Sequence, residues 1–503
     1  MIQFDEKTGI FHLSNAKMSY VMQVVRGRYL MHRYWGRKLR TFRDSRPFQE
    51  IDRAFSPQPA AYENERTFSL DVLPQEYPSY GHVDYRIPAY EVRLQDGATT
   101  TELFYKGYEI VKGKPALPGL PASYAAEDEA ETLKITLADS QGKLEAELLY
   151  TVFAGADAIA RSVRLTNSGK EPLDLLNAAS FALDFPDHDF ERMNLWGGHA
   201  SERTAERVPL MHGIEESASR RGASSHQASP FLALVRKDAG EESGEVYGFS
   251  LIWSGEFSLK TEVEQFGTTR VVGGINPFEF RWHLEPGEAF QTPEAILVYS
   301  TEGLNGMSQS FHELVRGKYR DAVRPILVNN WEATYFDFDD AKMDNLAACA
   351  KDLGIELMVL DDGWFGKRED DNSSLGDWVV NMEKLKGGLQ GVAESAHKRG
   401  LNPLIERCEA HGMQFGLWFE PEMVSVDSDL YRAHPDWVLR APSYPVSFGR
   451  HQLVLDLSRA DVRDYLVDAV CKILDTAPID YVKWDFNRNL TEVGSSLLPP
   501  ERQ

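Results

Sequence analysis

The strongest constraint on the fold is a regular alternation of apolar strands and amphipathic helices that begins near residue 326. Short apolar runs over 326–331, 355–360, 414–420 and 481–485 have the length and composition of buried strands, and helical periodicity fills the intervals between them. Repeated strand–helix units form a parallel sheet. The pattern therefore predicts a parallel α/β domain over residues 326–503.

Each of these predicted strands stops at charged, amide or aromatic side chains. In a (β/α)8 barrel the active site is built at the carboxyl ends of the strands. Acids accept hydrogen bonds from hydroxyl groups, and tryptophan faces stack on sugar rings, so such ends predict a pocket for a ligand rich in hydroxyls. The residues concerned are Trp331, Asp361, Asp362, Trp418, Glu420, Lys483 and Asp485.

The last strand carries the most informative set. Side chains alternate along a strand, so Lys483, Asp485 and Asn487 share one face. A buried lysine and carboxylate need polar partners. One interpretation is a nucleophile or base flanked by a cation and an amide, and the other is a structural ion pair that caps the strand.

Two further acidic motifs have alternative interpretations. Asp361 and Asp362 could hold Mg²⁺, which prefers carboxylate and water ligands, but no phosphate-binding glycine loop accompanies them. We predict neither a metal nor a cofactor. Glu420 lies before Pro421 and is interpreted as part of a structural turn that supports the third strand, in preference to a catalytic glutamate.

The first part of the chain is rich in β-strand patterns. Alternating runs over 132–137 and 143–148 flank a turn and predict a hairpin. Many short strands with no long helix predict a β-sandwich domain over 1–302. Apolar residues at helical spacing then predict a linker helix over 303–325.

Composition excludes some classes of partner. The net charge of −23 argues against nucleic acid and anionic membranes as partners. No apolar run approaches the ~18 residues of a membrane span, and the start lacks a secretory leader pattern, so a cytoplasmic protein is predicted. Cys349, Cys408 and Cys471 have neither disulfide nor zinc spacing and are predicted to be buried free thiols.

Four motifs together resemble the bacterial α-galactosidases of glycoside hydrolase family 36, and the resemblance covers essentially the whole chain. The motifs are NWEATYFDF at 330–338, LDDGWF at 360–365, GLWFEPEMVS at 416–425 and KWDFN at 483–487. The resemblance implies a β-supersandwich followed by the first half of a (β/α)8 TIM barrel. It also implies a retaining exo-α-galactosidase that hydrolyses short galacto-oligosaccharides such as melibiose and raffinose.

The same resemblance assigns roles to individual residues. Asp485 would be the nucleophile, kept ionised by Lys483. Asp361 and Asp362 would bind the axial 4-hydroxyl and the 6-hydroxyl of galactose, while Lys483 and Arg450 would hold the other ring hydroxyls. The remaining substrate-binding residues implied in this way are Trp331 and Trp418 as pocket walls, Trp484, Asn487 beside the nucleophile, Asp52 and His199.

Asp52 matches an aspartate that, in tetrameric relatives, reaches the site of a neighbouring subunit. A homo-oligomer, specifically a tetramer, is therefore expected. His199 departs from the family pattern, in which a tryptophan stands at this position. A 12-residue repeat over 388–413 lengthens the segment before the third barrel strand.

Residues 326–503 are fewer than the about 250 residues of a complete barrel, and they supply four strand–helix units where a barrel has eight. A retaining glycosidase needs a second carboxyl about 5–5.5 Å from the nucleophile, which the family carries on a later strand. The expectation is a fragment that lacks the acid/base, is inactive alone and exposes an open sheet edge prone to aggregation. The alternatives are a non-catalytic sugar-binding protein, or an α-N-acetylgalactosaminidase or galactosyltransferase of the same family.

Overall fold

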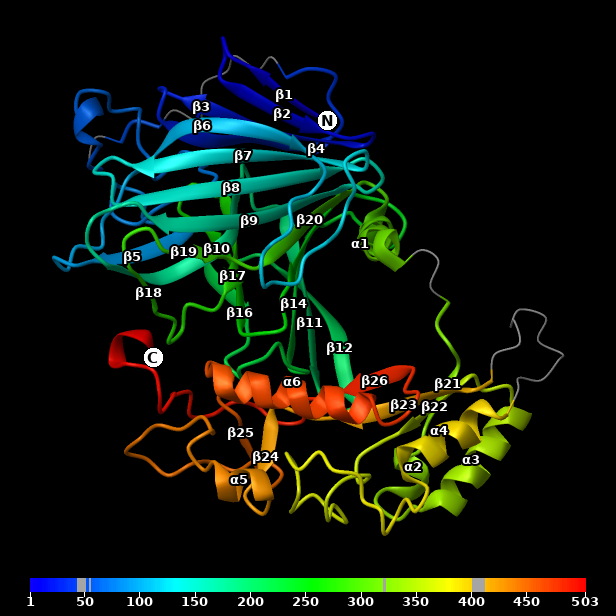
Figure 1. Ribbon diagram of the computed structural model, residues 1–503. Helices are drawn as coiled ribbons and strands as arrows, with labels where there is room; N and C mark the ends of the chain where they lie inside the picture. The colour runs from blue at the N-terminus through cyan, green and yellow to red at the C-terminus, as the bar shows by residue number, and fades with distance from the viewer. Residues whose placement is uncertain (43–50, 54–55, 320–322, 400–411) are drawn as a thin grey trace. The chain divides into compact units, whose positions relative to one another are not determined.

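The chain forms two compact units, residues 1–320 and 321–501, each described here by itself. The computed structural model describes residues 1–42, 51–53, 56–319, 323–399 and 412–503 (Figure 1). The first unit is rich in sheets and the second has parallel strands joined by helices, so the predicted order of a β-domain and a βα-domain is confirmed.

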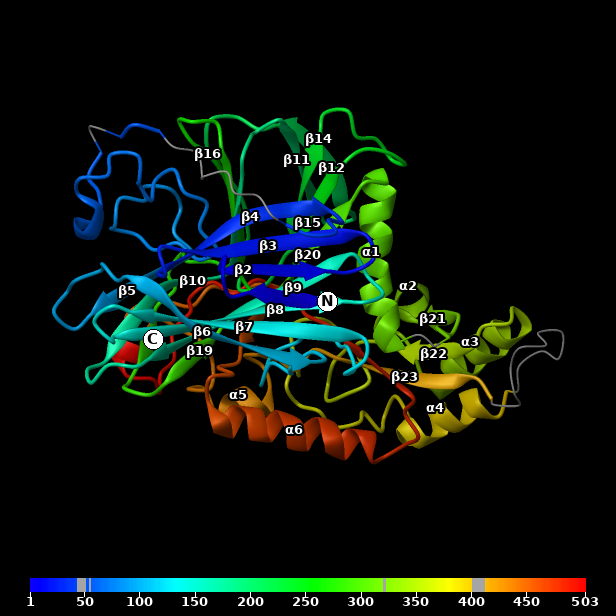
Figure 2. The same ribbon diagram turned by 90° about the horizontal axis from the view of Figure 1, so that it is seen from above.

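The described residues of the first unit form three antiparallel sheets (Figures 1 and 2). The four-stranded sheet has the order β1 (Ile2–Asp5), β2 (Ile10–Ser14), β3 (Met18–Val25) and β4 (Tyr29–Arg37). The ten-stranded sheet has the order β12 (Ser201–Pro209), β11 (Phe190–Gly198), β14 (Ala228–Arg236), β15 (Val246–Ile252), β20 (Glu294–Ser300), β9 (Ala158–Asn167), β8 (Leu144–Phe153), β7 (Ala130–Asp139) and β6 (Leu103–Lys112), with β19 (Ala289–Gln291) beside β9. The six-stranded sheet has the order β13 (Gly213–Ala218), β16 (Phe257–Val263), β17 (Thr269–Ile275), β10 (Leu173–Phe185) and β18 (Trp282–Leu284), with β5 (Tyr90–Leu94) beside β10, and one short 3-10 helix spans Ala60–Tyr62.

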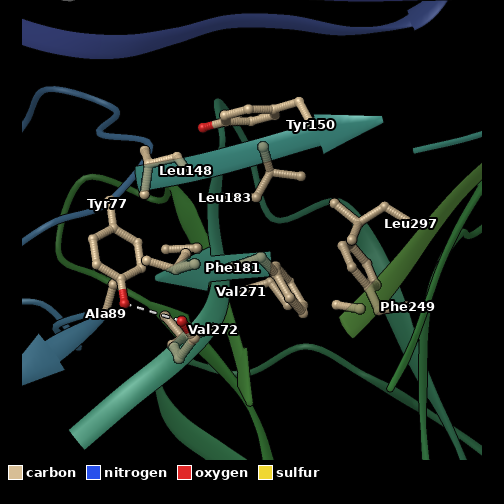
Figure 3. Packing of buried hydrophobic residues seen from close by; sticks show 14 of the residues in the cluster. Tyr77, Ala89, Leu148, Tyr150, Phe181, Leu183, Phe249, Val271, Val272 and Leu297 are labelled. Atoms are coloured by element: carbon tan, nitrogen blue, oxygen red, sulfur yellow. Dashed lines mark hydrogen bonds between the residues drawn. The ribbon is translucent and has the colours of Figure 1, made fainter. Parts of the chain in front are cut away.

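Apolar side chains of the two large sheets form the core of this unit (Figure 3). Leu148 and Phe249 of the ten-stranded sheet pack in one cluster with Phe181 and Val271 of the six-stranded sheet. The rings of Phe181 and Phe249 stack with centroids 5.4 Å apart. Alternation along each strand places these side chains on the inner faces, as a sandwich requires.

The predicted hairpin is confirmed. Strands β7 and β8 pair antiparallel along their whole length, with Leu133 opposite Tyr150 and Ile135 opposite Leu148. The period-two pattern read from the sequence is the pattern of inward and outward side chains in the structure.

A buried charge cluster lies within the same core. The Glu76 side chain is 0% exposed and accepts hydrogen bonds from the hydroxyls of Tyr20 and Tyr150, each at 2.8 Å. His32 Nδ1 lies 2.9 Å from Glu76 Oε1, and the Arg161 guanidinium lies 3.1 Å from Oε2. Burial alone would raise the pKa of Glu76, but the bond to His32 and the Arg161 charge outweigh it, so this pKa lies below its ordinary value.

Helix α1 (Gly303–Tyr319) belongs to the first unit, where it packs on β15 and β20. It was predicted as a linker. Gly248 on β15 allows the close approach, because a Cβ there would lie 2.7 Å from the Met307 sulfur and 2.9 Å from the Phe311 ring. Met307 is buried in a cluster with residues of the ten-stranded sheet, so this helix contributes to the core.

The second unit is an open parallel sheet of barrel type with the order β21 (Leu327–Asn329), β22 (Leu357–Leu360), β23 (Gln414–Phe419) and β26 (Tyr481–Trp484). These are the four strands predicted from the sequence. A short antiparallel ribbon joins β24 (Met423–Ser425) to β25 (Gln452–Val454). The helices are α2 (Trp331–Thr334), α3 (Asp340–Asp352), α4 (Gly388–His397), α5 (Asp429–Ala433) and α6 (Ala460–Leu474), followed by a 3-10 helix at Pro500–Arg502.

Local signals explain the helix boundaries. The Asp339 side chain accepts a hydrogen bond from the Lys342 N–H and caps the start of α3. Gly354 follows this helix with φ +76°, the left-handed conformation that glycine adopts most readily. Met343, Ala347 and Ala350 form the buried face.

The prediction of buried cysteines is wrong for two of the three. Cys349 and Cys471 are free but exposed, because they lie on the outer faces of α3 and α6. Cys408 and much of the 12-residue repeat fall in residues 400–411, outside the described residues. In the described ranges, no helix is both long and apolar enough to span a membrane.

Candidate active site

The four parallel strands bring polar residues to one edge of the sheet of the second unit. Parallel pairing aligns Asn329 with Val359, Leu360 with Leu417, and Phe419 with Trp484. The residues directly after these strands therefore follow one another along the carboxyl edge, where barrel enzymes carry their sites. They are Asn330, Asp361, Asp362, Glu420 and Asp485.

Asp361 is held by donors from two other strands. Its side chain is buried, and Oδ2 accepts from Asn329 Nδ2 at 2.5 Å and from Lys483 Nζ at 2.7 Å. Asn330 Oδ1 accepts from the Asp361 backbone N–H at 2.7 Å. The carboxylate therefore has a fixed orientation before any ligand binds.

Asp362 is paired with Arg368, a residue that the sequence analysis missed. The guanidinium is fully buried and donates to both carboxylate oxygens, with Nε at 2.9 Å from Oδ1 and Nη2 at 2.8 Å from Oδ2. Burial raises the pKa of Asp362 above its ordinary value, although the Arg368 bonds and charge oppose the change. A buried arginine six residues after an acid gives no periodic signal in the sequence.

Asp485 is half-buried and accepts three hydrogen bonds. Trp418 Nε1 and Asn487 Nδ2 donate to Oδ2 at 3.0 and 2.8 Å, and the Phe486 N–H donates to Oδ1 at 3.1 Å. Lys483 Nζ lies 3.9 Å from Oδ2. Burial alone would raise the pKa of Asp485, but these bonds and the lysine charge outweigh it, so the pKa lies below its ordinary value.

Lys483 links the two acids. Its ammonium contacts Asp361 directly and lies within ion-pair distance of Asp485. A strand edge with one carboxylate kept ionised and two more beside it can offer a nucleophile and several acceptors for hydroxyl groups.

The tryptophans differ from one another. Trp418 is 1% exposed and packs against Phe365 and Trp378, so only its N–H faces Asp485. Trp331 contacts Tyr335 and Phe336 with its ring, and Trp484 is 58% exposed with Nε1 donating to Glu422 Oε1 at 2.9 Å.

Arg450 has an ion pair of its own, with Nη2 3.7 Å from the Asp371 carboxylate. Its charge nevertheless acts on Asp362 and Glu420, where it partly opposes the rise in pKa that burial causes in both carboxyls. Its backbone has φ +52°, which is uncommon for a residue other than glycine.

Asp52 and His199 belong to the first unit. Asp52 forms a bidentate pair with Arg66 at 2.7 and 2.9 Å, and both side chains are 60% exposed. His199 is exposed in the turn between β11 and β12. In the described ranges, no group of three or more histidine, cysteine, aspartate or glutamate side chains could hold a metal ion.

Glu420 is among the strand-end residues singled out from the sequence, where it is interpreted as part of a structural turn. Its side chain is 0% exposed, and Oε1 accepts from the Asn487 N–H at 2.6 Å. Burial raises the pKa of Glu420 to about 7. The signal available in the sequence was its position directly after a strand, the same as that of Asp361 and Asp485.

Comparison with known proteins gives the family. Residues 28–285 match the glycosyl hydrolase family 36 N-terminal domain, and residues 289–503 match the melibiase domain. The chain is 55% identical to α-galactosidase AgaA of Geobacillus stearothermophilus, with 100% of this chain and 68% of the relative covered.

Solved structures agree with this match. The crystal structure of α-galactosidase AgaB from the same organism has a TM-score of 0.94 at 54% identity, covering 100% of this chain and 68% of that one. A variant of AgaA crystallised with raffinose has a TM-score of 0.93 at 55% identity, covering 98% and 68%. The chain thus belongs to glycosyl hydrolase family 36.

Proposed function

We propose that this chain is part of a retaining α-galactosidase that releases terminal α-linked galactose from short oligosaccharides such as melibiose and raffinose, and that it lacks the acid/base of that enzyme. The observation that carries the proposal is the Lys483 ammonium, which lies 2.7 Å from Asp361 and 3.9 Å from Asp485 on one strand edge. This arrangement supports a nucleophile adjacent to acceptors for galactose hydroxyls. The similarity to α-galactosidases, including one crystallised with raffinose, supports the substrate class.

Asp485 is the proposed nucleophile. Its lowered pKa keeps it ionised at neutral pH, as attack requires. A carboxylate oxygen forms a bond to the anomeric carbon while the bond from that carbon to the leaving oxygen breaks, and an acid protonates the leaving oxygen. The conjugate base of that acid, which the family carries on a later strand, then takes a proton from a water whose oxygen attacks the anomeric carbon. The bond from that carbon to Asp485 breaks, which releases galactose with retention and restores both the carboxylate and the acid.

The proposed specificity rests on the two adjacent acids. Asp361 and Asp362 are proposed to accept hydrogen bonds from the 4- and 6-hydroxyls, and their fixed orientations support this role. Lys483 and Arg450 are proposed to hold the remaining ring hydroxyls. The other proposed substrate contacts are Trp331, Trp418, Trp484 and Asn487.

The test is Asp485→Asn in the complete gene product. Turnover of an aryl α-galactoside should fall at least about 10⁴-fold, since the nucleophile is lost. Binding of galactose, measured by calorimetry, should persist because Asp361 and Asp362 are unchanged. Full activity in this variant would reject the assignment.

Assembly and location are proposed in the same way. A tetramer is proposed in which Asp52, from the first unit of one subunit, and His199 contribute to substrate binding; the exposure of both side chains supports this. Native mass measurement tests the assembly. A cytoplasmic location is proposed on the exposed free thiols of Cys349 and Cys471, which suit a reducing compartment, and cell fractionation tests it.

A further inference from the structure

Two glutamates after β23 hold the chain on either side of Asp485. Glu420 Oε1 accepts from the backbone N–H of Asn487 at 2.6 Å. Glu422 Oε1 accepts from the indole N–H of Trp484 at 2.9 Å. The segment that carries Asp485 is thus tied to the neighbouring strand end one residue before this acid and two residues after it.

Glu420 has the raised pKa that a catalytic acid needs, but not the position. Its side chain is 0% exposed, and burial raises its pKa to about 7, while that of Asp485 is lowered. A pair of carboxyls with separated pKa values often marks an acid and a nucleophile. A general acid must lie within hydrogen-bond reach of the leaving oxygen, which a fully buried side chain cannot offer.

The contacts of Glu420 point to another role. Asn487, which it holds through the backbone, donates from Nδ2 to Asp485 Oδ2 at 2.8 Å. Rotation of this backbone would remove one of the two donors on that oxygen. We infer that Glu420 is a positioning residue, which fixes Asn487 so that its amide keeps the Asp485 carboxylate aimed at the anomeric carbon. This inference rests on the proposed function.

The protonation state of Glu420 matters to its neighbours. The charged groups that act on it are Asp485 and Asp362, which raise its pKa, and Arg450, which lowers it. The second oxygen, Oε2, is buried and has no hydrogen-bond partner among the described residues. These surroundings favour the neutral form of Glu420. Ionisation would add a negative charge close to Asp485 and would disturb the segment that carries Asp485 and Asn487.

The variants Glu420→Ala and Glu420→Gln separate positioning from simple packing. In the complete gene product, Glu420→Ala should lower kcat for p-nitrophenyl α-galactoside about 100-fold with little change in KM, because the nucleophile loses its alignment. Glu420→Gln keeps an acceptor for the Asn487 N–H without the ionisable group. It should keep kcat within about tenfold, and the fall in activity above pH 7 should move to higher pH.

Glu422→Gln is the matched control. Glu422 lies two residues from Glu420, is partly buried, and accepts a hydrogen bond from the indole N–H of Trp484 in the same segment. It should leave the fall in activity near pH 7 in place. The inference is overturned if both Glu420 variants match wild type in kcat and in pH profile. It is also overturned if folded Glu420→Gln is as inactive as Glu420→Ala, which would mean that the ionisable carboxyl itself is required. If the wild-type protein does not hydrolyse the galactoside at all, the proposed function fails instead.

Discussion

Glu76 in the first unit and Glu420 in the second are both fully buried glutamates, yet their pKa values move in opposite directions. Glu76 is surrounded by two tyrosine hydroxyls, His32 and Arg161, so its charge is compensated. Glu420 has one backbone donor and two acidic neighbours. Equal burial therefore does not determine the ionisation state; the donors and charges do.

The difference separates a structural acid from one at a reactive centre. The Glu76 carboxylate, whose charge is compensated by its donors, stabilises the contact between strands and has no reason to change its protonation state. A carboxyl with an unused oxygen beside Asp485 is poised to change its protonation state near neutral pH, as groups at functional sites often are.

The largest expected effect comes from breaking the compensated cluster. Glu76→Ala leaves Arg161 buried without its anion and should lower the free energy of unfolding of the first unit by about 3–5 kcal/mol. Urea denaturation followed by hydrogen exchange in peptides of β8 and β9 measures it. Glu76→Gln, which keeps the size of the side chain, is the control for the cavity. A loss below about 1 kcal/mol in Glu76→Ala would show that the cluster adds little.

The second prediction uses pH. The pKa of Glu420 is raised in the folded state to about 7, so the folded state binds its proton more tightly than the unfolded state does. The contribution of Glu420 to the free energy of unfolding is therefore fully present below about pH 4.5. It falls by about 3 kcal/mol as the pH rises to about 7. Glu420→Gln removes this dependence.

Between pH 5 and pH 8 the wild type should lose about 3 kcal/mol of its free energy of unfolding, whereas Glu420→Gln should not lose this contribution. Hydrogen exchange in peptides 414–420 and 481–487 reports it locally. The contribution of Glu76 has the opposite dependence, because its lowered pKa means that stability is lost only as pH falls below the ordinary glutamate range. Parallel pH dependence in both regions would contradict the comparison.

A third, smaller effect concerns the donors on Asp485. Trp418→Phe removes the N–H that lies 3.0 Å from Oδ2 while keeping an aromatic ring in the core. A hydrogen bond to a charged group contributes about 1.5–3 kcal/mol, so kcat/KM should fall roughly 10- to 100-fold. The acidic limb of the pH profile should move upward, since the pKa of Asp485 rises. An unchanged acidic limb would assign the lowered pKa to Lys483 and Asn487 instead.

The smallest effect is expected where the charges are exposed. Asp52 and Arg66 are each 60% exposed, and such pairs contribute about 0–1 kcal/mol. Asp52→Ala should leave the unfolding midpoint of the first unit nearly unchanged. Any large loss of activity in this variant would then arise from substrate binding or assembly, which native mass measurement distinguishes.

Much of the fold followed from periodicity. Alternation predicted the β7–β8 hairpin, and apolar runs predicted all four strands of the parallel sheet. Because parallel strands end at one edge, the proximity of Asp361, Lys483 and Asp485 followed as well. These features depend on local sequence and on general rules of sheet geometry.

The rest depends on contacts between residues far apart in the chain. The ring of Trp418 packs against Phe365 and Trp378, which the segment after β22 supplies. Neither residue has a periodic position that would reveal this. The bond from Asn487 to Glu420 joins residues 67 positions apart and is equally invisible in the sequence. The exposure of Cys349, by contrast, could have been derived from the spacing of Ala347 and Ala350 on the buried face of α3.

The ion pair between Lys483 and Asp361 also sets an order of events during synthesis. Its partners are separated by 122 residues, so the acid leaves the ribosome long before its cation has been made. At about 5–20 residues per second the wait is roughly 6–25 s. Asp361 therefore keeps its hydration until β26 arrives, and pairing of β26 with β23 is the step that brings Lys483 to this acid.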